Sequence, residues 1–123
     1  MMDLPKLSSE AVNMLVVLAE KQEVILKPAD PKEATVCLLR LRARYNQTAQ
    51  NPKLMELLIE EDLQDLKDYP IDLIEKACKA WRDNVENQYA PRSMSQLMGE
   101  CWRDLAERKR KKNRILALIN RNK

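Results

Sequence analysis

Two helix starts in this chain share one dipeptide pattern, a capping side chain followed by proline. Asp30-Pro31 and Asn51-Pro52 both have it. The Asp or Asn side chain accepts a hydrogen bond from the first turn of a helix, and proline suits the first helical position because its missing N–H would have no partner there. Tyr69-Pro70 marks a third start, since proline pushes the residue before it out of the helical region. These steps predict a chain built from consecutive helices.

The composition favours helices over strands along the whole chain. Its 123 residues include one glycine and no phenylalanine or histidine, while Leu, Ala, Glu, Lys and Arg are abundant. Those five residue types lose little on entering a helix. A chain of this length buries roughly 65% of the surface of its unfolded state, which is enough for one hydrophobic core. The predicted fold class is all-α, in a single domain.

Apolar residues at three- and four-residue steps place the helices more closely. The first helix is expected from Ser8 or Ser9. It should be largely buried, because the apolar residues between positions 11 and 18 cover too much of the helix surface for one that lies on water. Residues 22–29 are expected to connect it to a helix that runs from Pro31 to about Tyr45.

Further helices are expected from Pro52 to about Asp68, after the polar residues 46–50, and from Pro70 to about Val85. Ser93 followed three residues later by Gln96 is a capping box. A fifth helix is therefore expected to begin near Met94 and to continue through Leu105. If it reaches Asn120 it is roughly 40 Å long, so its second half is expected to project, fray or dock on a partner.

We therefore predict a compact bundle of about five helices with a long basic C-terminal helix. Residues 1–107 would form the bundle, and residues 108–123 a basic helical extension that binds a partner or is partly disordered. The expected core consists of large apolar residues with some alanine: Leu15, Leu18, Leu38, Leu41, Leu58, Leu66, Leu73, Ile74, Ala77, Trp81, Leu97 and Leu105.

Several chemistries lack their usual residues here. Without histidine the commonest general base and metal ligand is missing, and one glycine cannot form a phosphate-binding loop. The cysteines Cys37, Cys78 and Cys101 are odd in number and far apart, so we expect small buried hydrophobes in a reduced cytoplasm and no disulfide or metal pair. Residues 1–6 do not resemble a secretory leader, and no apolar run is long enough to span a membrane. We predict a cytoplasmic protein that is not an enzyme and has no cofactor.

An acidic block occupies the middle of the chain. Residues 56–75 hold eight carboxylates against one lysine: Glu56, Glu60, Glu61, Asp62, Asp65, Asp68, Asp72 and Glu75. Such a block can be an ordinary solvated face. Alternatively it can pair with a basic partner, such as a groove that normally holds nucleic acid, because opposite charge speeds association.

A basic block occupies the C-terminal end. Residues 103–123 hold nine basic and two acidic residues, in a chain whose net charge is +3. Like charges on one helix repel unless an acidic partner or an anion neutralises them. Contact with a partner protein or with nucleic acid is therefore expected from the basic residues and from the apolar residues that follow them. The alternative is that the apolar end of the helix folds back on the core. The residues concerned are Arg103, Arg108, Lys109, Arg110, Lys111, Lys112, Arg114, Ile115, Leu116, Leu118 and Ile119.

The aromatic residues do not favour stacking on single-stranded nucleic acid. They fall on or beside the apolar stripes, whereas a stacking platform needs exposed aromatics interleaved with basic residues. Trp81 and Trp102 are both expected in the core.

Seven residues in order resemble a pattern in the small all-helical phage helicase-loader family: Tyr69, Pro70, Ala77, Trp81, Tyr89, Pro91 and Leu97. The similarity covers residues 39–98. It differs in having Tyr89-Ala90-Pro91 where the family tends to Phe-Pro-Pro, and in the added helix at residues 10–20. The resemblance implies a protein that binds a replicative helicase and delivers it to the origin. By position, it implies that residues 108–119 contact the helicase.

Two functions of different classes follow from these patterns. The first is a phage or prophage accessory protein of DNA replication, helicase-loader-like, that acts by protein–protein contact. The second is a phage-encoded inhibitor of the anti-CRISPR kind, whose acidic face blocks the nucleic-acid-binding site of a host complex. Direct DNA binding through the basic C-terminal helix is a third alternative, alone or together with the first.

Overall fold

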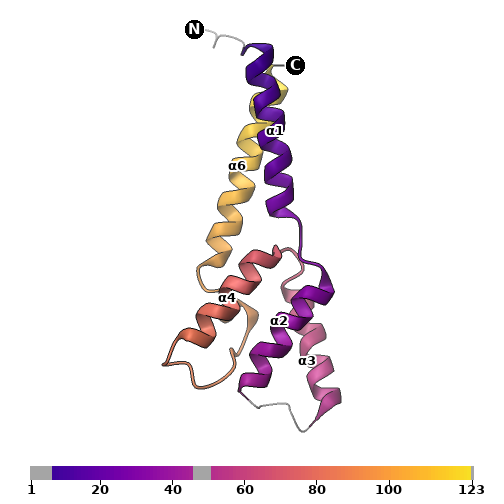
Figure 1. Cartoon of the computed structure of the whole chain (residues 1–123), viewed down its shortest axis with the longest axis vertical. Helices are drawn as coiled ribbons and strands as arrows, with labels where there is room; N and C mark the ends of the chain where they lie inside the picture. Colours follow the sequence, from indigo (N-terminus) through magenta and orange to yellow (C-terminus); the bar gives the residue numbers. More distant parts are fainter. Residues whose placement is uncertain (1–6, 46–50, 123) are drawn as a thin grey trace. The chain divides into compact units, whose positions relative to one another are not determined.

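The computed structural model describes residues 7–45 and 51–122, and every regular element in those ranges is an α-helix (Figure 1). Helices account for 77% of these residues, so the all-α prediction is confirmed. Six helices are present in the described residues where about five were predicted. The expectations for residues 1–6 and for the connection at residues 46–50 lie outside the described residues.

By their internal contacts the helices form two units, which are described separately. Residues 27–104 make up one, here called the core unit, and residues 1–26 with 105–123 make up the other, here called the helix-pair unit. The sequence-based division at residue 107 separates the first helix from the C-terminal helix, whereas the contacts put these two helices in one unit.

The core unit begins with two helices whose starts match the capping pattern. Helix α2 (Pro31–Arg44) is capped by Asp30, whose Oδ1 accepts a hydrogen bond from the Lys32 N–H at 2.8 Å. Helix α3 (Pro52–Asp65) is capped by Asn51, whose Oδ1 accepts from the Leu54 N–H at 3.1 Å. Both predicted starts are confirmed, and they form because the signal is local to one helical turn.

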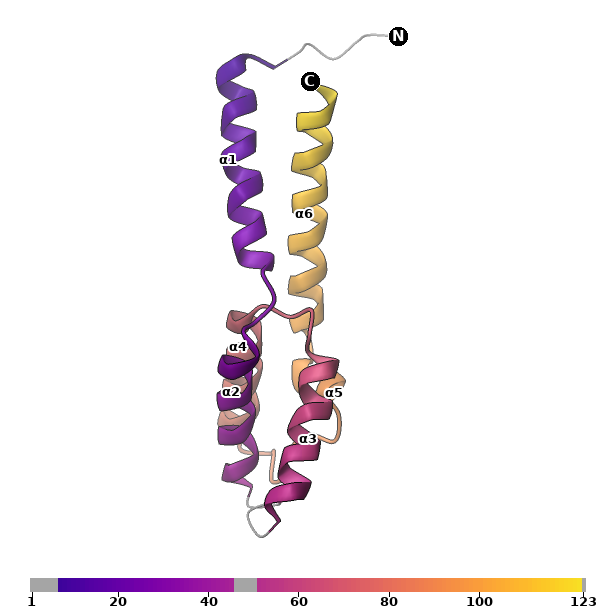
Figure 2. The same ribbon diagram turned by 90° about the vertical axis from the view of Figure 1, so that its right-hand side faces the viewer.

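Helix α4 (Ile71–Asp83) follows the buried Pro70, as predicted. It packs on α2, which in turn packs on α3, and α4 also contacts the short α5 (Met94–Met98) (Figure 2). The centre of this packing is formed by the most completely buried side chains: Leu38, Leu41, Leu73, Ile74 and Cys78. Two helices therefore supply the centre of the core unit, α2 with two of these side chains and α4 with three.

The single glycine divides the helix that was predicted to run on from Met94. Gly99 has φ +50, in the left-handed region that glycine adopts without the steric penalty of a Cβ, and its N–H closes α5 by bonding the Ser95 carbonyl. A separate helix α6 then begins at Cys101 and ends at Arg121. Its first turn belongs to the core unit and the remainder to the helix-pair unit.

The capping box at the start of α5 differs from the usual one in the group that its glutamine binds. Ser93 Oγ accepts from the Gln96 N–H at 3.1 Å as expected, but Gln96 Oε1 accepts from the Arg92 N–H at 2.7 Å. The glutamine therefore ties down the residue before the cap. This bond helps to fix the loop that enters α5.

The predicted core is correct for most residues and wrong for some. Leu18 is exposed, and Leu15, Leu58 and Trp81 are only half-buried. Trp102, which was expected in the core, is also exposed. Buried residues absent from the predicted core include Met94, Met98, Ile115 and Ile119.

Helix α1 (Ser9–Leu26) departs furthest from expectation. It continues through residues 22–26, which were predicted to form a connection. It was also expected to be largely buried, yet its buried residues are Ala19 and Gln22 alone among its eighteen. Within its unit α1 has one neighbouring helix, α6, so one side is covered and the rest of its apolar surface stays exposed.

Candidate partner-binding surface

Helices α1 and α6 run side by side in opposite directions, as both ribbon views show (Figures 1 and 2). Near one end the Asn122 Oδ1 accepts a hydrogen bond from the Leu7 N–H at 2.9 Å. Toward the other end the Arg108 Nη1 donates to the Ile25 carbonyl at 3.0 Å, which satisfies a carbonyl in the last turn of α1. These two bonds set the antiparallel register of the pair.

The seam between the two helices follows a seven-residue repeat. Positions at alternating three- and four-residue steps face inward in antiparallel pairs of this kind. On α1 the less exposed residues recur in this way: Val12, Leu15, Ala19, Gln22 and Leu26. On α6 the corresponding residues are Leu105, Arg108, Lys112, Ile115 and Ile119. Ala19, Ile115 and Ile119 form its buried apolar cluster, with Leu15 and Leu116 packed against it.

One part of the seam is polar. Gln22 is 6% exposed, and its Oε1 has no hydrogen-bond partner among the described residues. Arg108 and Lys112 occupy seam positions on α6 and are half-buried, and the Lys112 Nζ lies 3.9 Å from a Glu23 carboxylate oxygen. A polar residue in such a seam sets register and lowers stability. The helix pair is therefore less well packed than the core unit.

The outer side of α1 carries the densest exposed apolar surface of this unit. Met14 is 67% exposed and Val24 is 73% exposed. A shallow hollow of about 320 Å³ lies here, lined by Asn13, Met14, Val17, Leu18 and Lys21. Contiguous exposed apolar surface is more common at sites of protein interaction than isolated exposed apolar residues are.

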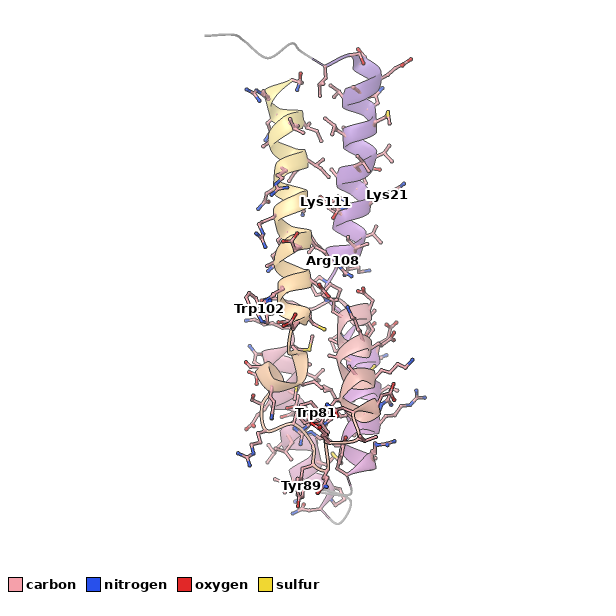
Figure 3. All side chains as sticks on the ribbon, turned by 90° about the vertical axis from the view of Figure 1, so that its left-hand side faces the viewer. Lys21, Trp81, Tyr89, Trp102, Arg108 and Lys111 are labelled. Atoms are coloured by element: carbon pink, nitrogen blue, oxygen red, sulfur yellow. The ribbon has the colours of Figure 1, made fainter. Side chains whose placement is uncertain are left out.

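A basic groove lies between α1 and α6 in the same unit. It has a volume of about 360 Å³ and is lined by Gln22, Ile25, Glu107, Arg108, Arg110, Lys111 and Arg114. Figure 3 shows Arg108 and Lys111 on the side of α6 that faces α1, with Lys21 on α1. Four of the seven lining residues are cationic, so the groove attracts negatively charged groups.

Some residues of the predicted basic site contact other residues of this protein and are therefore not free for a partner. Ile115 and Ile119 are buried and Leu116 is half-buried, so the expected apolar anchor packs against α1. Arg110 pairs with Glu107 at 2.8 Å. In the core unit, Arg103 lies 3.7 Å from Glu100 and places its guanidinium 5.5 Å from the centre of the Trp102 ring. Lys109, Lys111 and Arg114 are exposed, and among the described residues Lys111 and Arg114 have no ion-pair partner.

The predicted acidic face loses one member to the interior. Asp62 is 6% exposed, and its carboxylate accepts hydrogen bonds from the Arg42 Nε at 2.9 Å and Nη2 at 3.0 Å. Burial raises the pKa of the Asp62 carboxyl, and the hydrogen bonds and charge of Arg42 oppose that rise. Asp62 therefore joins α2 to α3. The other carboxylates of the acidic block are exposed: Glu56, Glu60, Glu61, Asp65, Asp68, Asp72 and Glu75.

The residues that carry the helicase-loader resemblance lie in the core unit. Ala77 is buried on α4, and Pro91 and Leu97 are buried at and after the loop that enters α5. The Trp81 Nε1 donates to the Tyr89 carbonyl at 3.0 Å, which ties the end of α4 to that loop. The Tyr89 side chain is exposed, so it contributes its backbone carbonyl to this bond and little to the core.

The cysteines divide between buried and half-buried positions. Cys78 and Cys101 are buried, as expected, and Cys37 is half-buried. Burial raises the pKa of the Cys78 thiol to about 12, so it stays protonated and unreactive at neutral pH. No group of three or more Cys, Asp or Glu side chains within residues 7–45 and 51–122 is arranged to hold a metal ion. In the same ranges no helix has the length and apolar character needed to cross a membrane.

Comparison with protein-family models gave no match for this chain, and comparisons with curated proteins and with solved structures gave no significant match either.

Proposed function

We propose that this protein acts by binding another protein, as a helicase-loader-like accessory factor of phage or prophage DNA replication. The observation that carries the proposal is the uncovered apolar side of α1 beside the basic groove shared with α6. A surface that combines exposed Met, Val and Leu with arginine and lysine has the composition of a protein interface. The resemblance of residues 39–98 to helicase loaders supplies the partner class.

The expected contact differs from the one that the resemblance alone implies. The resemblance implies that residues 108–119 contact the helicase, but Ile115 and Ile119 are buried against α1. Residues on both helices remain available, namely the apolar side of α1 and the exposed cations Lys111 and Arg114 on α6. We therefore assign partner binding to the helix pair as a folded unit.

The test is direct binding of the full chain to purified bacterial replicative helicases, measured by light scattering or biolayer interferometry. Val17→Glu places a charge on the apolar side of α1 and should weaken the complex at least tenfold. Val85→Glu is the matched control, because Val85 is 93% exposed and lies in the core unit. Absence of any complex with the wild-type chain would contradict the loader proposal.

A second function, inhibition of a nucleic-acid-binding complex, is supported by α3. Leu54 and Leu57 are exposed there alongside Glu56, Glu60 and Glu61, which gives the acidic face apolar contact points. Reversing Glu60, Glu61 and Asp65 to lysine tests this function without disturbing the buried Asp62. Loss of inhibition of a CRISPR nuclease complex in that variant, but not with Glu20, Asp83 and Glu86 reversed, would favour the inhibitor over the loader.

A further inference from the structure

The apolar hollow and the basic groove follow one another along α1, and the two together are here called the track. Met14, Leu18, Lys21 and Ile25 follow one another at four-, three- and four-residue steps, which places them on one line of the helix. The first three line the apolar hollow, and Ile25 lines the basic groove. Because Met14 and Ile25 are eleven residues apart, the track extends for about 16 Å, or three helical turns.

A matching line on α6 forms the opposite wall of the basic groove, whereas the apolar hollow is lined by α1 residues. Glu107, Lys111 and Arg114 recur at four- and three-residue steps and all line the basic groove. Leu118 continues that line four residues further and is exposed. The wall is thus cationic where it faces Ile25 and becomes apolar toward its C-terminal end.

We infer that this track receives an amphipathic α-helix of the partner protein, with an apolar stripe toward α1 and acidic side chains toward α6. The inference rests on the proposed function and names the chemistry of the partner segment. Two side-by-side helices leave a groove into which a third helix packs, and a docked helix places apolar anchors at three- and four-residue steps. The spacing of Met14, Leu18 and Ile25 suits such anchors.

The positive charge of the basic groove favours acidic side chains beside the apolar stripe of the docked helix. Among the described residues Lys111 and Arg114 have no ion-pair partner, and Lys21 adds a third cation on the α1 side. The acidic lining residue, Glu107, is already paired with Arg110 at 2.8 Å. Carboxylates on the docked helix would neutralise the cations that remain.

The same charges argue against a second copy of this chain on this surface. A two-fold contact brings each surface patch against itself, so Lys111 and Arg114 of one copy would approach the same cations of the other. Nucleic acid fits only half of the track, because a phosphate backbone would not use the apolar half at Met14, Val17 and Leu18.

Gln22 supplies an independent sign of a missing contact. Its side chain is buried, lines the basic groove, and holds an oxygen without a donor in the described part of the chain. Buried polar atoms ordinarily have partners. A hydroxyl, amide or ammonium group on the docked helix would provide that donor.

The experiment uses the full chain and two synthetic helical peptides of about 20 residues, long enough to hold a helix. One peptide carries leucine at the anchor steps with glutamate on the flanks, and its twin carries lysine in place of every glutamate. Fluorescence anisotropy should show that the acidic peptide binds at least tenfold more tightly than the twin. Val17→Glu should weaken binding of the acidic peptide at least tenfold, whereas Val85→Glu should leave it unchanged.

Charge reversal provides the sharpest control. Lys111→Glu combined with Arg114→Glu should reverse the preference, so that the lysine peptide binds more tightly than the glutamate peptide. Lys53→Glu combined with Lys79→Glu changes the net charge equally at exposed sites of the core unit and should leave the preference as it was. Equal binding of the two peptides by the wild-type chain would overturn the inference.

Two other results would also overturn it. A DNA oligonucleotide that binds more tightly than the acidic peptide, and is insensitive to Val17→Glu, would assign the groove to phosphates. Self-association that Val17→Glu abolishes would assign the apolar side of α1 to a second copy. If helicase binding depends on Val17 but not on Lys111 and Arg114, the proposed function stands and the acidic-helix inference fails.

Discussion

The core unit and the helix-pair unit use their apolar residues in different ways. In the core unit, α2 and α4 bury leucine and isoleucine almost completely, and the buried Arg42 and Asp62 satisfy one another. In the helix-pair unit the seam buries only a small apolar cluster of Ala19, Ile115 and Ile119 beside half-buried cations, while Met14 and Val24 face solvent. The first unit therefore covers its apolar side chains and pairs its buried charges, whereas the second leaves much of its apolar surface exposed.

The largest expected effect lies in the core unit, at the buried ion pair. Asp62→Asn leaves the Arg42 guanidinium buried without a counter-charge and should lower the free energy of unfolding by about 3–5 kcal/mol. Urea denaturation followed by circular dichroism measures the change. The exposed Asp65→Asn is the control, expected within about 0.5 kcal/mol. A double change to apolar residues, Arg42→Met with Asp62→Leu, should recover most of the loss.

The next largest effect is expected from truncating an apolar side chain, which should destabilise the protein more in the core unit than on the exposed side of α1. Ile74 is fully buried, so Ile74→Ala should lower the free energy of unfolding by about 2–5 kcal/mol through lost burial and a new cavity. Val24→Ala, on the exposed side of α1, should change it by less than about 0.5 kcal/mol. Similar losses for both variants, in the same denaturation assay, would contradict the contrast between buried and available apolar surface.

A substitution in the polar part of the seam is expected to increase the stability of the helix pair. Gln22→Leu replaces a buried oxygen that lacks a donor by an apolar group of similar size, and should stabilise the helix pair by about 1 kcal/mol. Hydrogen–deuterium exchange, read at the amides of α1, can resolve this local effect. If Gln22 serves the docked helix, the same variant should also bind the acidic peptide less tightly. Faster exchange in α1 would contradict the assignment of Gln22 as a destabilising seam residue.

The smallest effect is expected at the exposed cations. Lys111→Glu with Arg114→Glu should change the free energy of unfolding by less than about 1 kcal/mol, because exposed charges contribute little to folding. Thermal denaturation tests this. Lys112 is left out, since it is half-buried near Glu23 and its reversal would place two carboxylates together. Unfolding of the helix pair in this variant would mean that the basic groove is part of its structure.

The structure also changes how the C-terminal segment can be tested. Deletion of residues 108–123 would remove Ile115 and Ile119 from the cluster around Ala19, so lost binding could not be separated from lost structure. Single substitutions on exposed positions avoid this problem. They are therefore the informative variants for partner binding.

Sequence patterns were most informative in the core unit. The starts of α2, α3 and α4, and the buried stripe of Leu73, Ile74 and Ala77, followed from caps, prolines and periodicity. The candidate surface was harder to find, because the seven-residue repeat that joins α1 to α6 contains Gln22, Arg108 and Lys112. Gln22 was expected in a connection, and Arg108 and Lys112 were expected to contact a partner, so none of the three was predicted to lie between two helices. Their regular spacing relative to Leu105, Ile115 and Ile119 was the signal that could have revealed the seam.

The sequence by itself determined the all-helical class and most helix starts, since caps, prolines and three- and four-residue periodicity act within one or two turns. Only the tertiary structure decided which apolar residues are covered. The exposure of Leu18, the burial of Asp62 and the packing of Ile115 on Ala19 each depend on a neighbouring helix from a distant part of the chain. A periodic stripe indicates that a helix has an apolar side. Which neighbouring helix covers that side is decided by long-range packing alone.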